Sequence, residues 1–253
     1  MTTTYAAHPG RLKRLVSPGG LIDKYFYLFM SLLVTTVVVS AFSRSIDHGL
    51  LHPAFDPPVL LWVHGIVFFA WILFFVLQSA LVRVHRVKLH MLLGWYFAGL
   101  GAMIPVLGIS ITRVIYRIYI SQLHVNVNEL TAFSITQWLD MVGFTVAFGL
   151  AILLRKRPEY HRRLVLLAAC TLTAAAFGRL PHSHNPYLRF YLGVDGLILL
   201  GVLRDLLINR RVHPAYAWFV PSLVLLQLGA VFIWQNRPEW WLRIGRAFIG
   251  QTG

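Results

Sequence analysis

Apolar runs long enough to cross a bilayer recur along the chain, and they constrain its fold more than any other feature. One of them, the stretch LLWVHGIVFFAWILFFVLQSALV that begins at Leu60, shows the pattern. A run of about 18 residues or more with few charges is typical of a transmembrane helix. We therefore expect an all-α integral membrane bundle of seven transmembrane helices. The expected spans are 25–42, 58–82, 89–113, 133–154, 161–180, 187–207 and 216–236.

The charge distribution predicts the orientation of these spans. A formal net charge of +14 in a soluble chain would indicate nucleic-acid binding, but 57% of this chain is hydrophobic and only 13% is charged. Its basic residues gather in short segments between apolar runs. With the N-terminus inside, 15 of the 23 Lys and Arg lie on the cytoplasmic side. The positive-inside rule then favours an N-in, C-out arrangement, with the lipid bilayer rather than nucleic acid as the partner.

The chain divides into three parts. Residues 1–24 form a basic cytoplasmic segment, 25–236 the transmembrane domain, and 237–253 an amphipathic tail expected along the outer interface. Cleavage after the first apolar run is an alternative, although that run is longer than the apolar core of a typical signal peptide. Tryptophans near the span ends fit an aromatic belt, and Trp71 alone lies at mid-membrane.

The second span carries a polar stripe. At about 100° per residue, His64, Trp71 and Gln78 fall on one side of the helix with two phenylalanines, and the opposite side is entirely apolar. We expect this stripe to face the bundle interior. An apolar pocket with a few directed polar groups suits a quinone or another lipid-like cofactor.

Two aspartates, Asp140 and Asp195, fall inside predicted spans. A carboxylate near the bilayer centre costs about 2.5–3.5 kcal/mol, so each must be protonated, paired or next to water. One interpretation pairs them with Arg113, Arg179 or Arg189, which lie near the outer ends of their helices. The other makes them proton-relay, ion-binding, cofactor-binding or metal-ligand carboxylates. The sequence leaves both interpretations open.

Histidines and carboxylates together suggest a metal or haem site. His64, Asp140 and Asp195 could join His182 and His184 of the loop LPHSHNP around zinc, iron or copper. No linear zinc-hydrolase motif is present. Haem ligation needs two histidines at one depth, and only His64 lies well inside a span. A second set at the cytoplasmic boundary shares a depth and could also hold a cofactor; it consists of His90, His161 and His213. The basic stretches RPEYHRRL and NRRVHP are explained sufficiently by topology and by contact with anionic headgroups.

Four stretches give the chain a resemblance to a group of uncharacterised bacterial multi-span membrane proteins. They follow the patterns HGxxFxxWxxxFxxQ, LHxxLGW, RPExHxRL and RRxHP and run from the second span to the seventh. The relatives carry HRxLGW in the second stretch, so Met91 departs from their pattern. The resemblance implies a bacterial inner-membrane protein and implies no established activity.

Three classes of function are compatible with these features. The first is a redox-associated or cofactor-binding membrane protein that holds haem, a metal or quinone in an outward-facing polar pocket. The second is a non-catalytic subunit or assembly factor with other membrane subunits as partners. The third is a small-solute or proton-coupled transporter, although no broken-helix pair supports it. Whether the chain is an enzyme is left open.

Overall fold

The computed structural model describes residues 18–46, 52–180 and 185–251, and every element formed by these residues is a helix. The helices are α2 (Pro18–Ile46), α3 (Val59–Arg83), α4 (Val87–Leu123), α5 (Val127–Leu153), α6 (Pro158–Thr171), α7 (Ala174–Phe177), α8 (Pro186–Asn209), α9 (Pro214–Asn236) and α10 (Glu239–Ile249). The all-α prediction is confirmed for this part of the chain.

Five helices in the described residues are long and apolar enough to cross a membrane. They are Gly20–Ser43 within α2, Val59–Arg83, Val87–Leu123, Val127–Leu153 and Pro214–Asn236. The protein is therefore a multi-pass helical membrane protein by length and composition. The remaining two predicted spans correspond to α6 with α7 and to α8. The helix α6 has only 14 residues, and α8 contains Asp195, Arg204 and Asp205.

The predicted division of the second span into an inward and an outward face is confirmed. Trp71 in α3 is completely buried, and Gln78 is 6% exposed. On the other side of the same helix, Ile66 is 67% exposed and Leu73 is 49% exposed. Exposed leucine and isoleucine on a continuous helix face are what lipid contact requires.

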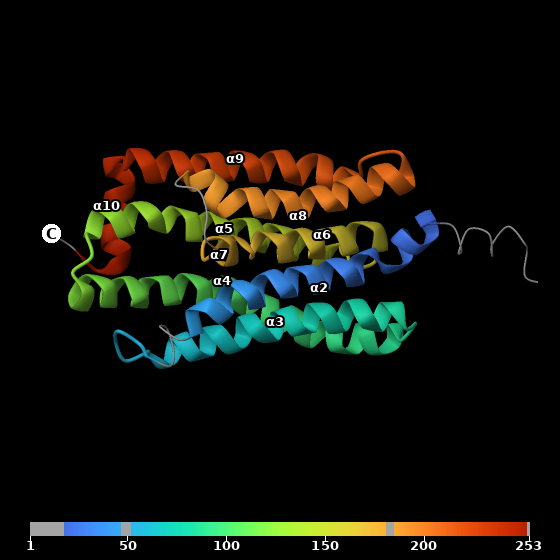
Figure 1. Ribbon diagram of the computed structural model, residues 1–253, viewed down its shortest axis with the longest axis horizontal. Coiled ribbons are helices and arrows are strands. Elements are labelled where there is room, and N and C mark those ends of the chain that lie inside the picture. Colours follow the sequence, from blue (N-terminus) through green and yellow to red (C-terminus); the bar gives the residue numbers. More distant parts are fainter. Residues whose placement is uncertain (1–17, 47–51, 181–184, 252–253) are drawn as a thin grey trace, which may run out of the picture.

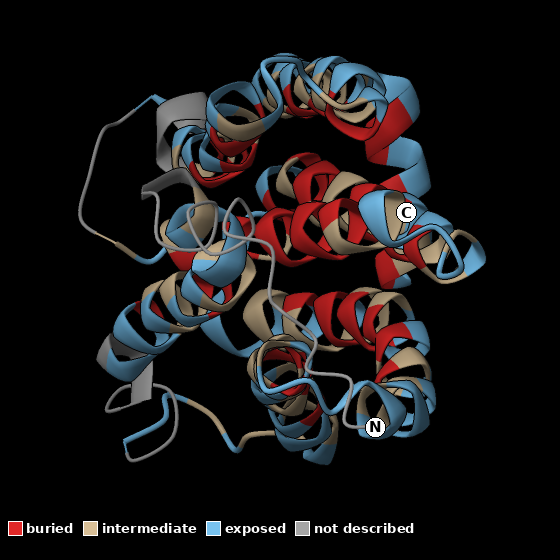
Figure 2. Ribbon diagram, turned by 90° about the vertical axis from the view of Figure 1, so that its right-hand side faces the viewer, coloured by how far each residue is buried: buried red, intermediate tan, exposed pale blue. Residues whose placement is uncertain are grey.

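The helices lie side by side along one long axis, and α10 lies across one end of the bundle (Figure 1). Viewed along that axis, the buried faces of the helices turn toward one another (Figure 2). The helix α6 occupies the centre, because it contacts α2, α5, α8 and α9. Every residue of α6 from Arg163 to Thr171 is buried. A helix that is buried on all sides belongs to the core of a bundle.

The short connections α3–α4, α5–α6 and α8–α9 bring their basic segments together. The beginnings of α2, α4, α6 and α9 and the ends of α3, α5 and α8 meet at one end, which we call the basic end (Figure 1). Proline occupies the first turn of both α6 and α9, where its missing N–H costs no hydrogen bond. At the opposite end, Asn126 caps α5 by accepting hydrogen bonds from the backbone N–H groups of Asn128 and Glu129.

Several boundaries differ from the sequence prediction: α2 begins at Pro18 rather than at 25, and α6 ends at Thr171 rather than at 180. The helix α4 continues to Leu123, ten residues past the expected end, and α5 begins at Val127 rather than at 133. The extension is amphipathic and is covered by the tail helix. Arg117 in α4 donates from Nε to the carbonyl of Ile249 at 2.5 Å, and Trp241 in α10 donates from Nε1 to the carbonyl of Thr131 at 2.9 Å.

Candidate functional site at the basic end

The stretch RPEYHRRL forms the first two turns of α6 and organises the basic end. Successive side chains on a helix point about 100° apart, so four consecutive residues face four different neighbours. The sequence analysis explained this stretch by topology and headgroup contact alone. That explanation is incomplete, because the Arg163 side chain is completely buried.

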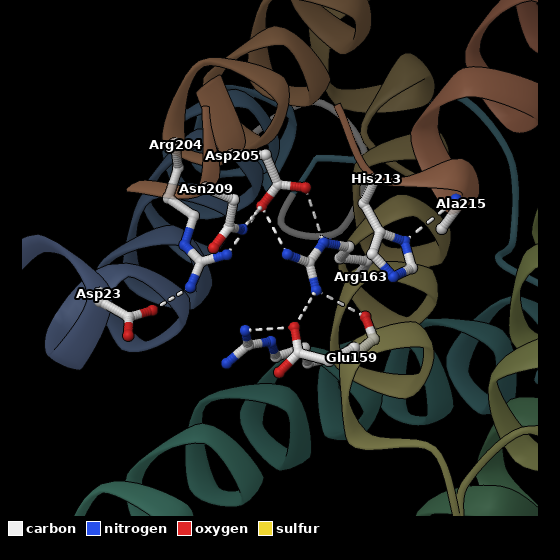
Figure 3. Close-up of polar contacts among 9 residues, drawn as sticks. Asp23, Glu159, Arg163, Arg204, Asp205, Asn209, His213 and Ala215 are labelled. Atoms are coloured by element: carbon white, nitrogen blue, oxygen red, sulfur yellow. Dashed lines mark hydrogen bonds and ion pairs between the residues drawn. The ribbon is translucent and has the colours of Figure 1, made fainter. Parts of the chain in front are cut away.

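Arg163 forms a forked ion pair with Asp205 of α8 (Figure 3). Its Nε and Nη2 atoms donate to the two carboxylate oxygens of Asp205 at 2.8 and 2.6 Å. Its Nη1 atom donates to the backbone carbonyl and to the side chain of Glu159 at 2.7 and 2.6 Å. Both Arg163 and Asp205 are 0% exposed. A buried ion pair is tolerated only when such additional hydrogen bonds satisfy it.

Arg204 extends the ion pair into a network across three helices. It donates from Nη1 to Asp205 at 2.7 Å and from Nη2 to Asp23 of α2. Its guanidinium lies 5.6 Å from the centre of the Tyr27 ring, and that of Arg162 lies 5.2 Å from it. The network therefore joins α2, α6 and α8 at the basic end (Figure 3).

Glu159 lies at the exposed edge of the network, and its side chain is 56% exposed. Partial burial raises the pKa of this carboxyl, but the hydrogen bonds and charges of Arg162 and Arg163 outweigh burial. The pKa of Glu159 therefore lies below its usual range.

Some polar atoms beside the network have no partner within the described part of the chain. They include the hydroxyl oxygens of Tyr27 and Tyr216 and the Nε atom of Arg204. Tyr216 points at α8, where a Cβ on Gly201 would lie beside its hydroxyl oxygen. Three buried N–H and O–H donors in one region need an acceptor, and ordered water is the usual one.

His161 faces the opposite side of α6 from Arg163 and meets His90 of α4. The centres of the two rings lie 6.3 Å apart with planes at 78°. Nδ1 of His161 contacts the carbonyl oxygen of Ala151 at 2.9 Å. Nδ1 of His90 lies 2.5 Å from the side-chain nitrogen of Gln78, in the amide orientation that matches every donor with an acceptor. Gln78, predicted as a cofactor-binding residue, therefore holds a histidine ring.

Tyr160 faces α9, where its ring packs edge-on against His213 with ring centres 4.5 Å apart. Nδ1 of His213 accepts from the backbone N–H of Ala215 at 3.1 Å and caps α9. Burial lowers the pKa of His213, and the positive charge of Arg163 lowers it further. The three boundary histidines all lie at the basic end, but His213 belongs to a different contact from His90 and His161.

A groove of about 390 Å³ begins beside Tyr160 and runs between α5 and α9. Leu164, Gly143 and Leu223 lie along its lining with other apolar side chains of the three helices. Trp218, which also lines it, is 79% exposed, so the groove opens at the outer surface of the helix bundle.

The other predicted site residues of α3 lie in packing contacts. Trp71 stacks on Phe97 of α4 at 4.1 Å and meets the edges of Phe144 and Phe148 of α5 at 5.2 and 4.8 Å. His64 packs on Phe68, one turn away in the same helix, with ring centres 4.0 Å apart. These contacts do not test the predicted cofactor-binding role of either residue.

The two predicted intramembrane aspartates lie in different surroundings. Asp195 accepts a hydrogen bond from Gln227 of α9 at 3.1 Å. Asp140 has no ion pair or hydrogen bond with any described residue. No three His, Cys, Asp or Glu side chains in the described part could hold a metal ion, so these aspartates and His64 do not form such a group alone. His182 and His184 lie outside the described residues.

The predicted arginine partners are engaged elsewhere where their side chains are described. The guanidinium of Arg113 lies over Phe248 of α10 at 6.0 Å. That of Arg179 lies over Phe42 of α2 at 4.3 Å and donates to the carbonyl of Ala175. The side chain of Arg189 is outside the described part.

Comparisons with known proteins give no family for this chain: no family model, no curated protein and no solved structure matches it.

Proposed function

We propose that this protein is a redox-associated, multi-pass membrane protein that binds a quinone in the groove between α5 and α9. The observation that carries the proposal is an apolar groove, open to lipid, that begins at Tyr160, whose ring packs against His213 just outside the lining. Small-molecule sites of about 300–1,000 Å³ with apolar walls and few polar groups are typical of such ligands.

The polar end of the groove can recognise a carbonyl oxygen. His213 accepts a hydrogen bond at Nδ1 from the backbone of α9, so its neutral ring carries the proton on Nε2 and donates from there. The Tyr160 hydroxyl is a second donor beside it. Two donors at the end of an apolar groove match a quinone head, whose carbonyl oxygens only accept, and the groove receives its apolar tail.

The proposal includes the topology: seven spans, N-in and C-out, in a bacterial inner membrane. From Pro158 to Phe177, α6 and α7 together contain enough residues for a bilayer of about 30 Å. The charges of α8 at Arg204 and Asp205 are paired inside the bundle, which lowers their cost of insertion. Reporter fusions at the two termini test this orientation, which is contradicted if both report the same side.

The ligand is tested by extracting lipids from the purified protein and measuring quinone by mass spectrometry. Val146→Trp fills the groove from its lining and is expected to abolish co-purification. Val142→Trp is the matched control, because Val142 lies one turn away on α5, is similarly exposed at 44%, and does not line the groove. Equal quinone in both variants would place the ligand elsewhere.

The head-group contact is tested with Tyr160→Phe, which keeps the ring against His213 and removes one donor. We expect weaker quinone retention without loss of thermal stability. Oxidised and reduced visible spectra and a metal analysis of the same preparation test the haem and metal alternatives. A preparation with no quinone, no haem band and no stoichiometric metal would favour the non-catalytic subunit instead.

A further inference from the structure

We propose that His90 and His161 form a binding site for one hydroxyl group, in which His90 is a fixed hydrogen-bond donor and His161 is the proton acceptor. The site does not depend on the quinone groove, which lies on another side of α6. Four helices supply it: Gln78 from α3, His90 from α4, Ala151 from α5 and His161 from α6.

The contact of His161 with the backbone fixes its tautomer. A carbonyl oxygen only accepts, so Nδ1 of His161, 2.9 Å from the carbonyl oxygen of Ala151, must carry the proton. The neutral ring then has a lone pair on Nε2. A histidine held in this way through one nitrogen presents the other as a base.

The contacts of Gln78 fix the opposite tautomer in His90. The side-chain oxygen of Gln78 accepts from the backbone N–H of Gly94 at 3.2 Å, which leaves its nitrogen facing His90. That nitrogen donates to the backbone carbonyl of His90 at 3.2 Å and to Nδ1 at 2.5 Å. Because Nδ1 accepts, the proton of neutral His90 lies on Nε2.

The two rings therefore offer complementary groups, an N–H from His90 and a lone pair from His161. A direct N–H···N bond of about 2.9 Å would place the ring centres about 5 Å apart. The observed ring-centre separation is 6.3 Å, about 1 Å more than a direct bond allows, and one oxygen bonded to both rings would account for the difference. Both histidines are partly exposed rather than fully buried.

A hydroxyl group satisfies both rings at once. Its oxygen accepts from Nε2–H of His90, and its proton is donated to Nε2 of His161. In proton transfer the O–H bond breaks, an N–H bond forms on His161, and the resulting imidazolium keeps its contact with Ala151. The oxygen retains the electron pair and the hydrogen bond from His90. Without a ligand, the occupant is a water molecule.

The test is nitrogen NMR of the full-length protein with ¹⁵N-labelled histidine in nanodiscs, since nitrogen shifts distinguish the two tautomers. The His90 and His161 signals are assigned with His90→Gln and His161→Gln. We expect the Nε2–H tautomer for His90 and the Nδ1–H tautomer for His161. Gln78→Leu is expected to remove the preference of His90 and to leave His161 unchanged. Gln137→Leu is the control, because it removes a partly buried side-chain amide of α5 that does not contact either histidine; it should change neither tautomer.

The occupant is identified by exchange with water and by titration with phenol, which offers one donor and one acceptor. A shift of both Nε2 signals on adding phenol, lost in His161→Gln, supports a ligand site. Water exchange without a phenol shift supports the same pair with water as its occupant. The same tautomer in both histidines, or no contact with either hydroxyl source, would overturn the proposal.

Discussion

Replacing Asp205 with Asn is expected to destabilise the protein more than any other single change in the network at the basic end. The Asp205 side chain is completely buried, and its carboxylate accepts from both Arg163 and Arg204. The substitution leaves two buried guanidinium groups facing a neutral amide. Removing one partner of a buried ion pair costs about 3–5 kcal/mol, and we expect a loss in this range.

Substitutions at two other members of the network are expected to lower the unfolding free energy by less. Arg163→Met leaves Asp205 paired with Arg204 at 2.7 Å and leaves Glu159 in contact with solvent, so we expect a smaller loss of about 1–3 kcal/mol. Glu159→Gln removes a charge from a side chain that is 56% exposed, and its expected effect is below about 1 kcal/mol.

The assay is reversible unfolding of the purified protein by SDS in mixed micelles, followed by tryptophan fluorescence. Glu239→Gln removes half of the exposed ion pair with Arg246 on α10 and is the matched control, expected to be close to wild type. A double-mutant cycle between positions 163 and 205 measures their coupling. The reasoning is refuted if Asp205→Asn costs no more than Glu159→Gln.

Further predictions concern helix packing and pH. Gly101→Ala should lower the unfolding free energy by about 1–3 kcal/mol, because its Cβ would overlap the ring of Phe148. Gly99→Ala meets open space and should leave the unfolding free energy unchanged or raise it by up to about 1 kcal/mol, because alanine favours the helix over glycine; SDS unfolding compares the two. The pKa of His213 is lowered from 6.5 by burial and by Arg163, so its contribution to stability is present above pH 6.5 and is lost as the pH falls through the lowered value. His213→Asn, which retains a cap acceptor, should reduce this dependence in melting curves, and an unchanged pH profile would assign it to other groups.

Much of the helix layout could be predicted from the sequence, because lipid selects for a simple pattern. Five predicted spans correspond to helices that can cross a membrane, and the apolar side of α3, with Ile66 and Leu73, is exposed as expected. Lipid hydrocarbon penalises every exposed polar group, so the residues on the outward face of each helix must be apolar, and they recur at helical spacing in the sequence.

The interior of the bundle was harder to predict. Arg162 and Arg163 are adjacent and chemically identical, yet the side chain of the first is 32% exposed and that of the second is completely buried. Only the position of Asp205, 42 residues later, distinguishes them. The end of α6 at Thr171 was missed for a local reason: the Thr171 and Thr173 hydroxyls donate to carbonyls of the preceding turn, which often bends a helix.

The basic end shows why a positive-inside signal can conceal buried polar contacts between helices. Arginines that orient a helix during insertion are expected at the headgroups, where each needs only water and phosphate. In RPEYHRRL the same segment begins a helix that is buried on all sides, so its polar side chains must find partners in the protein. Arg163 forms an ion pair with Asp205, the ring of His161 faces that of His90, and the ring of Tyr160 packs against His213 beside the groove. A basic loop that leads into a central helix therefore places paired polar groups between helices, and these are the positions where a ligand can replace a partner.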